Sequence, residues 1–372
     1  MTLGVSFQIT ERIKGNMLRN LKLILVALIS AGLQTAAFAE TPIVLPCQNN
    51  DRDCAAKLRS QSPIKKMSYW KSAFERPVEQ RIGSAPDELA VYLNLDNIAG
   101  GVANRPQPAT IPEDFLKDVN DAVAELPVQV KQLIAGKLAG IYFVKDLGGS
   151  GYTDSIDNIF GSNAGFIVLD IDVLARSTAN AWATWKERTP FNADSRYRLD
   201  AAIEANTQDN RKNAIQYILL HELGHVISLG ENIHPQWGQQ ENKISPDRYP
   251  FAKLSWETVN QNDGGYISRF ETQFPLRKNI VYYFGARLDG NQMIDAYRQL
   301  EGTNFPTLYA ATSPSDDFAE SFVSYVHTVI LKRPLEIRIY RDGQIAETYK
   351  SCWELKRCAE KRKLLEYLLK AR

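Results

Sequence analysis

The sequence predicts an α+β protein, because segments typical of strands and of helices follow one another along the chain. Residues 140–147 (GIYFVKDL) and 165–174 (GFIVLDIDVL) are rich in β-branched and aromatic residues, which predicts two strands. Residues 209–229 predict a helix, because they open with polar residues and end at Gly230. Residues 316–331 predict a second long helix.

The N-terminal half contains further predicted elements. Residues 40–75 are polar and contain prolines, which predicts an extended lead-in. Residues 86–103 include AVYLNL, which predicts a strand. Residues 113–137 have apolar residues at helical spacing, and Pro127 is expected to divide them into two helices. The glycine-rich residues 148–155 predict a loop.

The C-terminal half ends in a predicted hairpin and a helix. Residues 293–301 predict a helix, and residues 335–350 predict a hairpin that turns at Asp342-Gly343. Residues 353–370 predict a basic amphipathic helix. Its lysines and arginines are expected to form a solvated face rather than a membrane-binding surface, because the chain is nearly neutral overall.

Residues 17–39 have the pattern of a secretory signal peptide. A short basic start and an apolar run precede an A-x-A cleavage site at residues 37–39, so that cleavage is expected before Glu40. The apolar run is shorter than the roughly 20 residues that span a bilayer. We therefore expect residues 1–39 to be removed on export, with either Met17 as the true start or an unusually long basic region.

Composition and cysteine content define the class of protein. Hydrophobic residues make up 44% and aromatic residues 10%, which is typical of a globular fold. The 44 basic and 43 acidic residues argue against a nucleic-acid binder. Four cysteines follow the predicted cleavage site, which suggests disulfides in an exported chain. Local pairing (Cys47 with Cys54, Cys352 with Cys358) and pairing between the termini are both credible, and a four-cysteine zinc site is the metal alternative.

The motif with chemical content is His221-Glu222-Leu223-Gly224-His225, an HExxH sequence on the predicted helix 209–229. Its two histidines are four residues apart, so both imidazoles lie on one helix face and can bind one zinc ion. Glu222 can reach a water at that ion without being a ligand, as a general base must. The apolar flanks predict a buried helix, in which two histidines and a glutamate need partners.

A third zinc ligand must come from elsewhere, since the longer metzincin motif is absent. Asp316 and Glu320 are four residues apart on a predicted helix, so they share a face. One carboxylate could bind zinc while the other holds a ligand histidine by its second N–H group. Asp317 is expected to be a solvated acid near the helix start. His234 is expected to be a bystander or a residue of the substrate cleft.

HELGH followed by DDFAE at 316–320 resembles the gluzincin metallopeptidases, in particular the lethal-factor-type and Pro-Pro endopeptidase families, and the titration-factor peptidases have a related acidic segment. The resemblance implies a zincin-like domain with Asp316 as the third zinc ligand and Glu320 as a supporting acid. It also implies a catalytic tyrosine seven residues before the ligand, and residue 309 is Tyr. A phenol at Tyr309 would stabilise the developing oxyanion.

The chain departs from these families at two points. It has Asp316 where they have Glu, so its helix must lie closer to the histidines, or else Glu320 is the ligand. The interval of 316 − 225 = 91 residues after His225 is long, which predicts a helical insertion at about 236–300. Most aromatic residues of the insertion are expected to form a local core: Trp237, Trp256, Tyr266, Phe270, Tyr282 and Tyr283.

The predicted organisation is a signal peptide (1–39), an N-terminal lead-in (40–110) and a zincin-like catalytic domain (111–372) with a small mixed sheet. The resemblance gives strand 165–174 the place of the edge strand that pairs with an extended peptide. The predicted function is that of an exported zinc (Zn2+) metallopeptidase, periplasmic or secreted, which cleaves peptide or protein substrates and has no nucleic-acid partner or membrane span. The alternatives are an exported zincin-fold binding or structural module without peptidase activity, and a zinc amidase that acts on cell-wall material.

Overall fold

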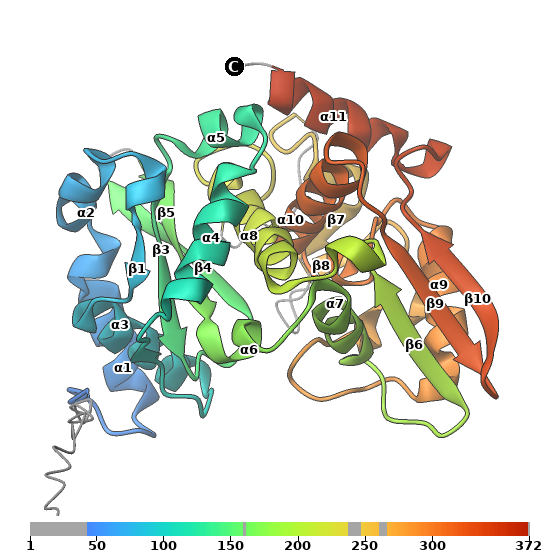
Figure 1. The fold of residues 1–372 in the computed structure, drawn as a ribbon, viewed down its shortest axis with the longest axis horizontal. Helices are drawn as coiled ribbons and strands as arrows, with labels where there is room; N and C mark the ends of the chain where they lie inside the picture. The colour runs from blue at the N-terminus through green and yellow to red at the C-terminus, as the bar shows by residue number, and fades with distance from the viewer. Residues whose placement is uncertain (1–42, 159–160, 237–246, 260–265, 371–372) are drawn as a thin grey trace, which may run out of the picture. The chain divides into compact units, whose positions relative to one another are not determined.

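A central pair of helices, α8 (Arg211–Ser228) and α10 (Pro314–Tyr325), lies side by side between two β-sheets (Figure 1). The first sheet contacts α8 directly, and the second packs on α7 (Ala179–Arg188), which in turn packs on α8. Every residue of α8 from Asn213 to Ser228 is buried, as expected of a helix that is covered on all sides. The predicted α+β class is confirmed.

The computed structural model describes residues 43–158, 161–236, 247–259 and 266–370, and these belong to one compact unit. The predicted signal peptide and Trp237 lie outside the described residues. The remaining α-helices are α1 (Arg52–Gln61), α2 (Met67–Phe74), α3 (Asp87–Gly100), α4 (Glu113–Ala124), α5 (Val128–Ile134), α6 (Ile171–Ala175), α9 (Met293–Glu301) and α11 (Ala359–Lys370). The strands are β1 (Ile82–Ser84), β2 (Gln107–Pro108), β3 (Leu138–Lys145), β4 (Gly151–Asn158), β5 (Gly161–Asp170), β6 (Tyr197–Ala202), β7 (Trp256–Val259), β8 (Tyr266–Ser268), β9 (Glu336–Arg341) and β10 (Gln344–Lys350).

The first sheet has the strand order β1-β3-β5-β4, and β2 pairs with the end of β3. β1, β3 and β5 are parallel, with Ile141 of β3 opposite Ile167 of β5. β4 runs antiparallel to β5 and forms the edge of the sheet. The edge position therefore belongs to β4, and the prediction that strand 165–174 is the edge strand is wrong.

The second sheet has the order β10-β9-β6, and all of its pairs are antiparallel. The predicted hairpin is confirmed: β9 and β10 are joined by Asp342 and Gly343, whose φ angles are 52° and 81°. Positive φ at both central residues is what a type I′ turn requires. The predicted break at Pro127 is also confirmed, since α4 ends at Ala124 and α5 begins at Val128.

Two predictions for the N-terminal region are wrong. Residues 40–75 are not an extended lead-in, because they contain α1 and α2, and α1 packs against α3. The AVYLNL segment belongs to α3 rather than to a strand. Since α3 buries residues on most of its circumference, including Leu89, Tyr92 and Leu93, its sequence carries no clear helical period. β1 of this region pairs with β3, so the region contributes to the same sheet as the chain that follows.

Two further differences lie close to α8. The segment 148–155, predicted as a loop, enters β4 at Gly151, because pairing with β5 supplies the backbone hydrogen bonds that its glycine-rich sequence does not suggest. The strand predicted for 165–174 ends at Asp170, whose side chain caps the start of α6. The described part of the insertion is less helical than predicted. It contains short 3₁₀ turns, the β7–β8 ribbon and, at its end, α9.

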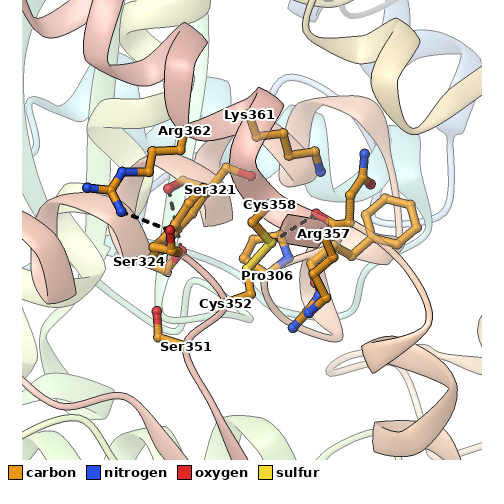
Figure 2. Close-up of a disulfide and its surroundings, with 12 residues drawn as sticks. Pro306, Ser321, Ser324, Ser351, Cys352, Arg357, Cys358, Lys361 and Arg362 are labelled. Atoms are coloured by element: carbon orange, nitrogen blue, oxygen red, sulfur yellow. Dashed lines mark hydrogen bonds between the residues drawn. A yellow bond between two sulfur atoms is a disulfide. The ribbon is translucent and has the colours of Figure 1, made fainter. Parts of the chain in front are cut away.

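Two disulfides are present, and both join neighbouring cysteines: Cys47 with Cys54, and Cys352 with Cys358. The local pairing is thus confirmed over pairing between the termini and over a four-cysteine zinc site. Figure 2 shows the second disulfide beside Lys361 of α11, at the point where the chain enters that helix. Within the described part of the chain, none of the helices has the length and apolar character needed to cross a membrane.

Candidate active site

The HExxH motif lies on the buried part of α8. Asn210 caps the start of the helix, and its side chain accepts a hydrogen bond from the backbone N–H of Asn213. The helical spacing brings His221 and His225 to the same face, with their Nε2 atoms 3.2 Å apart. Burial lowers the pKa of His225 well below its ordinary value, so that its imidazole is neutral, which is the form that binds a metal.

The close approach of α10 to α8 depends on a glycine. A Cβ atom on Gly224 would stand 2.9 Å from Cα of Ala319, so the two helices are in backbone contact at this level. Asp316 lies one turn before Ala319, and its Oδ1 is 3.6 Å from Nε2 of His225. One potential ligand atom from each of His221, His225 and Asp316 lies within 4.8 Å of the other two.

Hydrogen bonds at the start of α10 fix the Asp316 side chain. Ser313 caps the helix by accepting from the backbone N–H of Asp316. The hydroxyl groups of Ser313 and Thr312 both donate to Oδ2 of Asp316, at 2.8 and 3.0 Å. The other carboxylate oxygen, Oδ1, is the one that faces His225. Burial raises the pKa of Asp316, as expected for a carboxyl group in this enclosed position.

Glu320 lies behind His221 rather than beside His225. Its Oε1 is 2.9 Å from Nδ1 of His221, the imidazole nitrogen remote from His225. Burial opposes ionisation of Glu320, but the ammonium group of Lys186 and the imidazole of His221 outweigh it and lower the pKa. Burial likewise acts to lower the pKa of His221, but the Glu320 carboxylate outweighs burial, so the pKa of His221 is raised. Of the two acids considered as the third ligand, Asp316 is therefore the one grouped with both histidines.

Glu222 contacts the edge strand β4. Thr153 of β4 donates from Oγ1 to Oε2 of Glu222 at 2.6 Å. Gly151 leaves room for this carboxylate, since a Cβ atom there would stand 2.4 Å from Oε1 of Glu222. Burial raises the pKa of Glu222 above its ordinary value, which makes the carboxylate a stronger base.

Tyr309 lies in a 3₁₀ turn, Tyr309–Ala311, that precedes α10. Its ring is stacked on that of His221, with a centroid separation of 5.5 Å and an angle of 20° between the planes. Tyr282 also packs against the Tyr309 ring, with 4.6 Å between the two centroids. Burial raises the pKa of Tyr309 well above its ordinary value, so the phenol stays protonated and can donate a hydrogen bond.

A cavity of about 300 Å³ opens beside these residues, with His221, Glu222 and Tyr309 in its wall. Leu93 of α3 and Val102 line the cavity from the N-terminal region, and Phe284 lines it from the insertion. The region predicted as a lead-in thus forms one wall of the site.

Asp317 and Lys361 differ from their predicted surroundings, and His234 fits the bystander role rather than the cleft role among the two predicted for it. Asp317 is buried rather than solvated, because it forms an ion pair with Lys361 and accepts a hydrogen bond from the indole of Trp256 at 3.1 Å. Lys361 is therefore not part of a solvated basic face. His234 is buried against Ser228, with Nε2 2.9 Å from Oγ of that residue, and does not line the cavity. The prediction of a core role is confirmed for Trp256 and Tyr282, whereas Tyr283 lines the cavity.

Sequence reasoning missed Thr153, Thr307 and Lys186, which hold the carboxylates of Glu222 and Glu320. Thr153 and Lys186 lie 69 and 134 residues from their partners, whereas Thr307 lies 13 residues before Glu320, beyond the reach of helical spacing. The chain matches no protein-family model, no curated protein and no solved structure.

Proposed function

We propose that this chain is a zinc-dependent metallopeptidase of the gluzincin type with a zincin-like catalytic fold. The observation that carries the proposal is the grouping of ligand atoms from His221, His225 and Asp316 within 4.8 Å. Two imidazoles and a carboxylate are a ligand set of catalytic zinc sites, which leave a fourth position open. Tetrahedral bonds of 2.0–2.1 Å separate two ligand nitrogens by about 3.4 Å. The two Nε2 atoms, 3.2 Å apart, fit that geometry.

The residues around this group suit the hydrolysis of an amide. A bound Zn2+ would supply Lewis-acid polarisation of water and of the scissile carbonyl. Glu222, oriented by Thr153, is placed to take a proton from water and to pass it to the leaving nitrogen. The protonated phenol of Tyr309 can donate to the carbonyl oxygen as negative charge develops there. A module that only binds metal would need neither Glu222 nor Tyr309.

An extended peptide is the substrate that the sheet favours. β4 is the edge strand, and its residues Gly151 and Thr153 lie against Glu222. A peptide that added to this edge by backbone hydrogen bonds would pass the general base. The two disulfides are typical of exported proteins, which supports a periplasmic or secreted location.

Metal analysis and peptide cleavage test the proposal. The purified protein should contain one zinc ion per chain, and it should cleave casein or a peptide library with loss of activity on chelation. Glu222→Gln should bind zinc as the wild type does and cleave nothing. Protein that contains zinc but cleaves no peptide would support the binding-module or amidase alternative instead.

A further inference from the structure

Lys186 of α7 is a buried cation next to the candidate ligands. Its Nζ lies 2.8 Å from Oε1 of Glu320, and the same oxygen is 2.9 Å from Nδ1 of His221. The ammonium group and the imidazole therefore share one carboxylate oxygen. Thr307 donates to the other oxygen, Oε2, at 2.7 Å. Three partners from separate parts of the chain thus fix the orientation of the Glu320 carboxylate.

Lys186 also contacts the candidate catalytic tyrosine. Its Nζ lies 4.8 Å from the centroid of the Tyr309 ring, within the range of a cation–π interaction. The Tyr309 ring stacks in turn on His221. The ammonium group of Lys186 therefore contacts Glu320, which lies against His221, and also Tyr309, whose ring stacks on His221. Lys186, Glu320 and Tyr309 all line the same cavity.

Stability does not explain this arrangement. A buried ion pair gains little over apolar residues of the same volume, because desolvation of both charges offsets their attraction. Here a second acid, Glu187, has Oε1 3.6 Å from Nζ of Lys186, and its Oε2 accepts hydrogen bonds from Tyr282 and Tyr297. A cluster of two acids and one lysine is a costly way to fill a core, so its position beside His221 points to a role in the site.

We propose that Lys186 is a positioning residue of the active site: it holds Glu320 against His221 and the Tyr309 ring in its place. This inference rests on the proposed function, since it assumes that His221 binds the metal. Without Lys186, the Glu320 carboxylate is a buried charge with one partner fewer and can turn away from Nδ1 of His221. The imidazole then loses the contact that fixes its ring, and Tyr309 loses the cation on its face.

Lys186→Met tests the role, and Lys361→Met is the matched control, because Lys361 is the partner of another buried carboxylate on α10. Lys186→Met should weaken zinc affinity by about 10–100-fold, as is usual when an outer partner of a ligand is lost. It should also lower kcat by about tenfold or more, because small misplacements of reacting groups are costly, with KM little changed. Lys186→Arg should restore part of both losses.

Zinc affinity is measured by chelator competition, and kcat and KM are measured at a temperature at which every variant is folded. Lys361→Met should lose stability yet keep zinc affinity and kcat within about twofold. If Lys186→Met does not fold, Lys186→Gln replaces it, with losses in the same direction but smaller.

Equal zinc affinity and equal kcat in the wild type and the Lys186 variants would overturn the inference and leave the proposed function intact. Wild-type protein that binds zinc but cleaves no peptide would overturn the proposed peptidase, while the affinity comparison would still decide the role of Lys186. Wild-type protein without zinc affinity would overturn both.

Discussion

The two buried lysine–carboxylate pairs of α10 have the same chemistry but different neighbours. Glu320 pairs with Lys186 of α7 and reaches His221 through the same oxygen. Asp317 pairs with Lys361 of α11, and its other oxygen accepts from the indole of Trp256. The first pair lines the cavity, whereas the second is enclosed by aromatic rings, with Nζ of the lysine 4.9 Å from the ring of Phe305.

The pKa values of the two lysines differ in direction. Burial acts to lower the pKa of Lys186, but Glu320 and Glu187 outweigh it and raise the pKa. Burial prevails at Lys361 and lowers its pKa to about 8, even though Asp317 is its partner. The surroundings of Lys186 thus have an excess of negative charge, as a site for a metal cation does, and those of Lys361 do not. The groups that surround a buried ion pair, and not the pair itself, indicate whether it belongs to a functional site.

Replacing each of the adjacent acids Asp316 and Asp317 with asparagine should give the largest difference in zinc affinity. Zinc-binding free energies of about 10–16 kcal/mol, shared among three or four ligands, amount to about 4 kcal/mol each. Asp316→Asn should therefore weaken zinc affinity about a thousandfold. Asp317→Asn should leave zinc affinity nearly unchanged and reduce stability instead. Chelator competition together with thermal unfolding separates the two, and equal zinc affinities would remove Asp316 from the ligand set.

Breaking the Lys361–Asp317 pair should mainly reduce the stability of the fold. Lys361→Met leaves Asp317 as a buried charge without its cation, which typically costs about 3–5 kcal/mol of unfolding free energy. Urea unfolding of the metal-free protein measures this cost. The double variant Lys361→Met/Asp317→Leu should recover most of the loss, since it removes both charges. Failure of the double variant to recover would mean that the pair does more than compensate charge.

As the pH falls, protonation of His327 in the turn that continues α10 should reduce stability before Glu320 of the Lys186 pair is protonated. His327 lies in the π-helical turn Val326–Ile330, and burial lowers its pKa from 6.5 to about 4. The folded state then binds fewer protons than the unfolded state between pH 6.5 and 4, so stability should fall as the pH falls through this window, by about 3 kcal/mol. The lowered pKa of Glu320 keeps its charge over the same range.

His327→Gln should flatten that pH dependence, because glutamine keeps a donor for the carbonyl oxygen of Ile203 but does not titrate. The slope that remains should come largely from His225 and His234: burial also lowers the pKa of His225 well below its ordinary value and that of His234 to about 4. Urea unfolding at pH 7, 5.5 and 4.5 measures the effect. An unchanged slope in His327→Gln would show that His327 is not a neutral buried histidine.

Removing the disulfide next to α11 should have the smallest effect. Cys352 and Cys358 are six residues apart, and closing so short a loop stabilises a fold by about 2 kcal/mol. Cys352→Ser/Cys358→Ser should lose about that amount and keep zinc affinity. A drop in zinc affinity would show that the Lys361 side of α10 also influences the metal ligands.

The sequence predicts the local parts of the candidate site and misses the contacts between distant segments. The HExxH spacing, the pair Asp316 and Glu320, and Tyr309 seven residues before the acid are short-range patterns on elements that helical periodicity identifies. Lys186 pairs with an acid 134 residues away, and neither partner shows this in its own segment. The sequence predicts a solvated Asp317, because the start of a helix is a usual place for exposed acids.

The fold shows the same division. Helices with one apolar face and the Asp-Gly hairpin were recognisable, because their patterns arise from local geometry. The sequence of α3 predicts a strand because the helix is buried on most sides, and the glycine-rich start of β4 predicts a loop although pairing with β5 makes it a strand. Both errors concern elements whose structure depends on their neighbours.

The backbone contact between Gly224 and Ala319 has a consequence for the choice of acid at residue 316. With α8 and α10 this close, a side chain with one methylene group already brings an oxygen to 3.6 Å from Nε2 of His225. A glutamate would carry its carboxylate past that point, so Asp316→Glu is not a conservative exchange in this protein. The length of the side chain at residue 316 is therefore matched to the separation of the two helices.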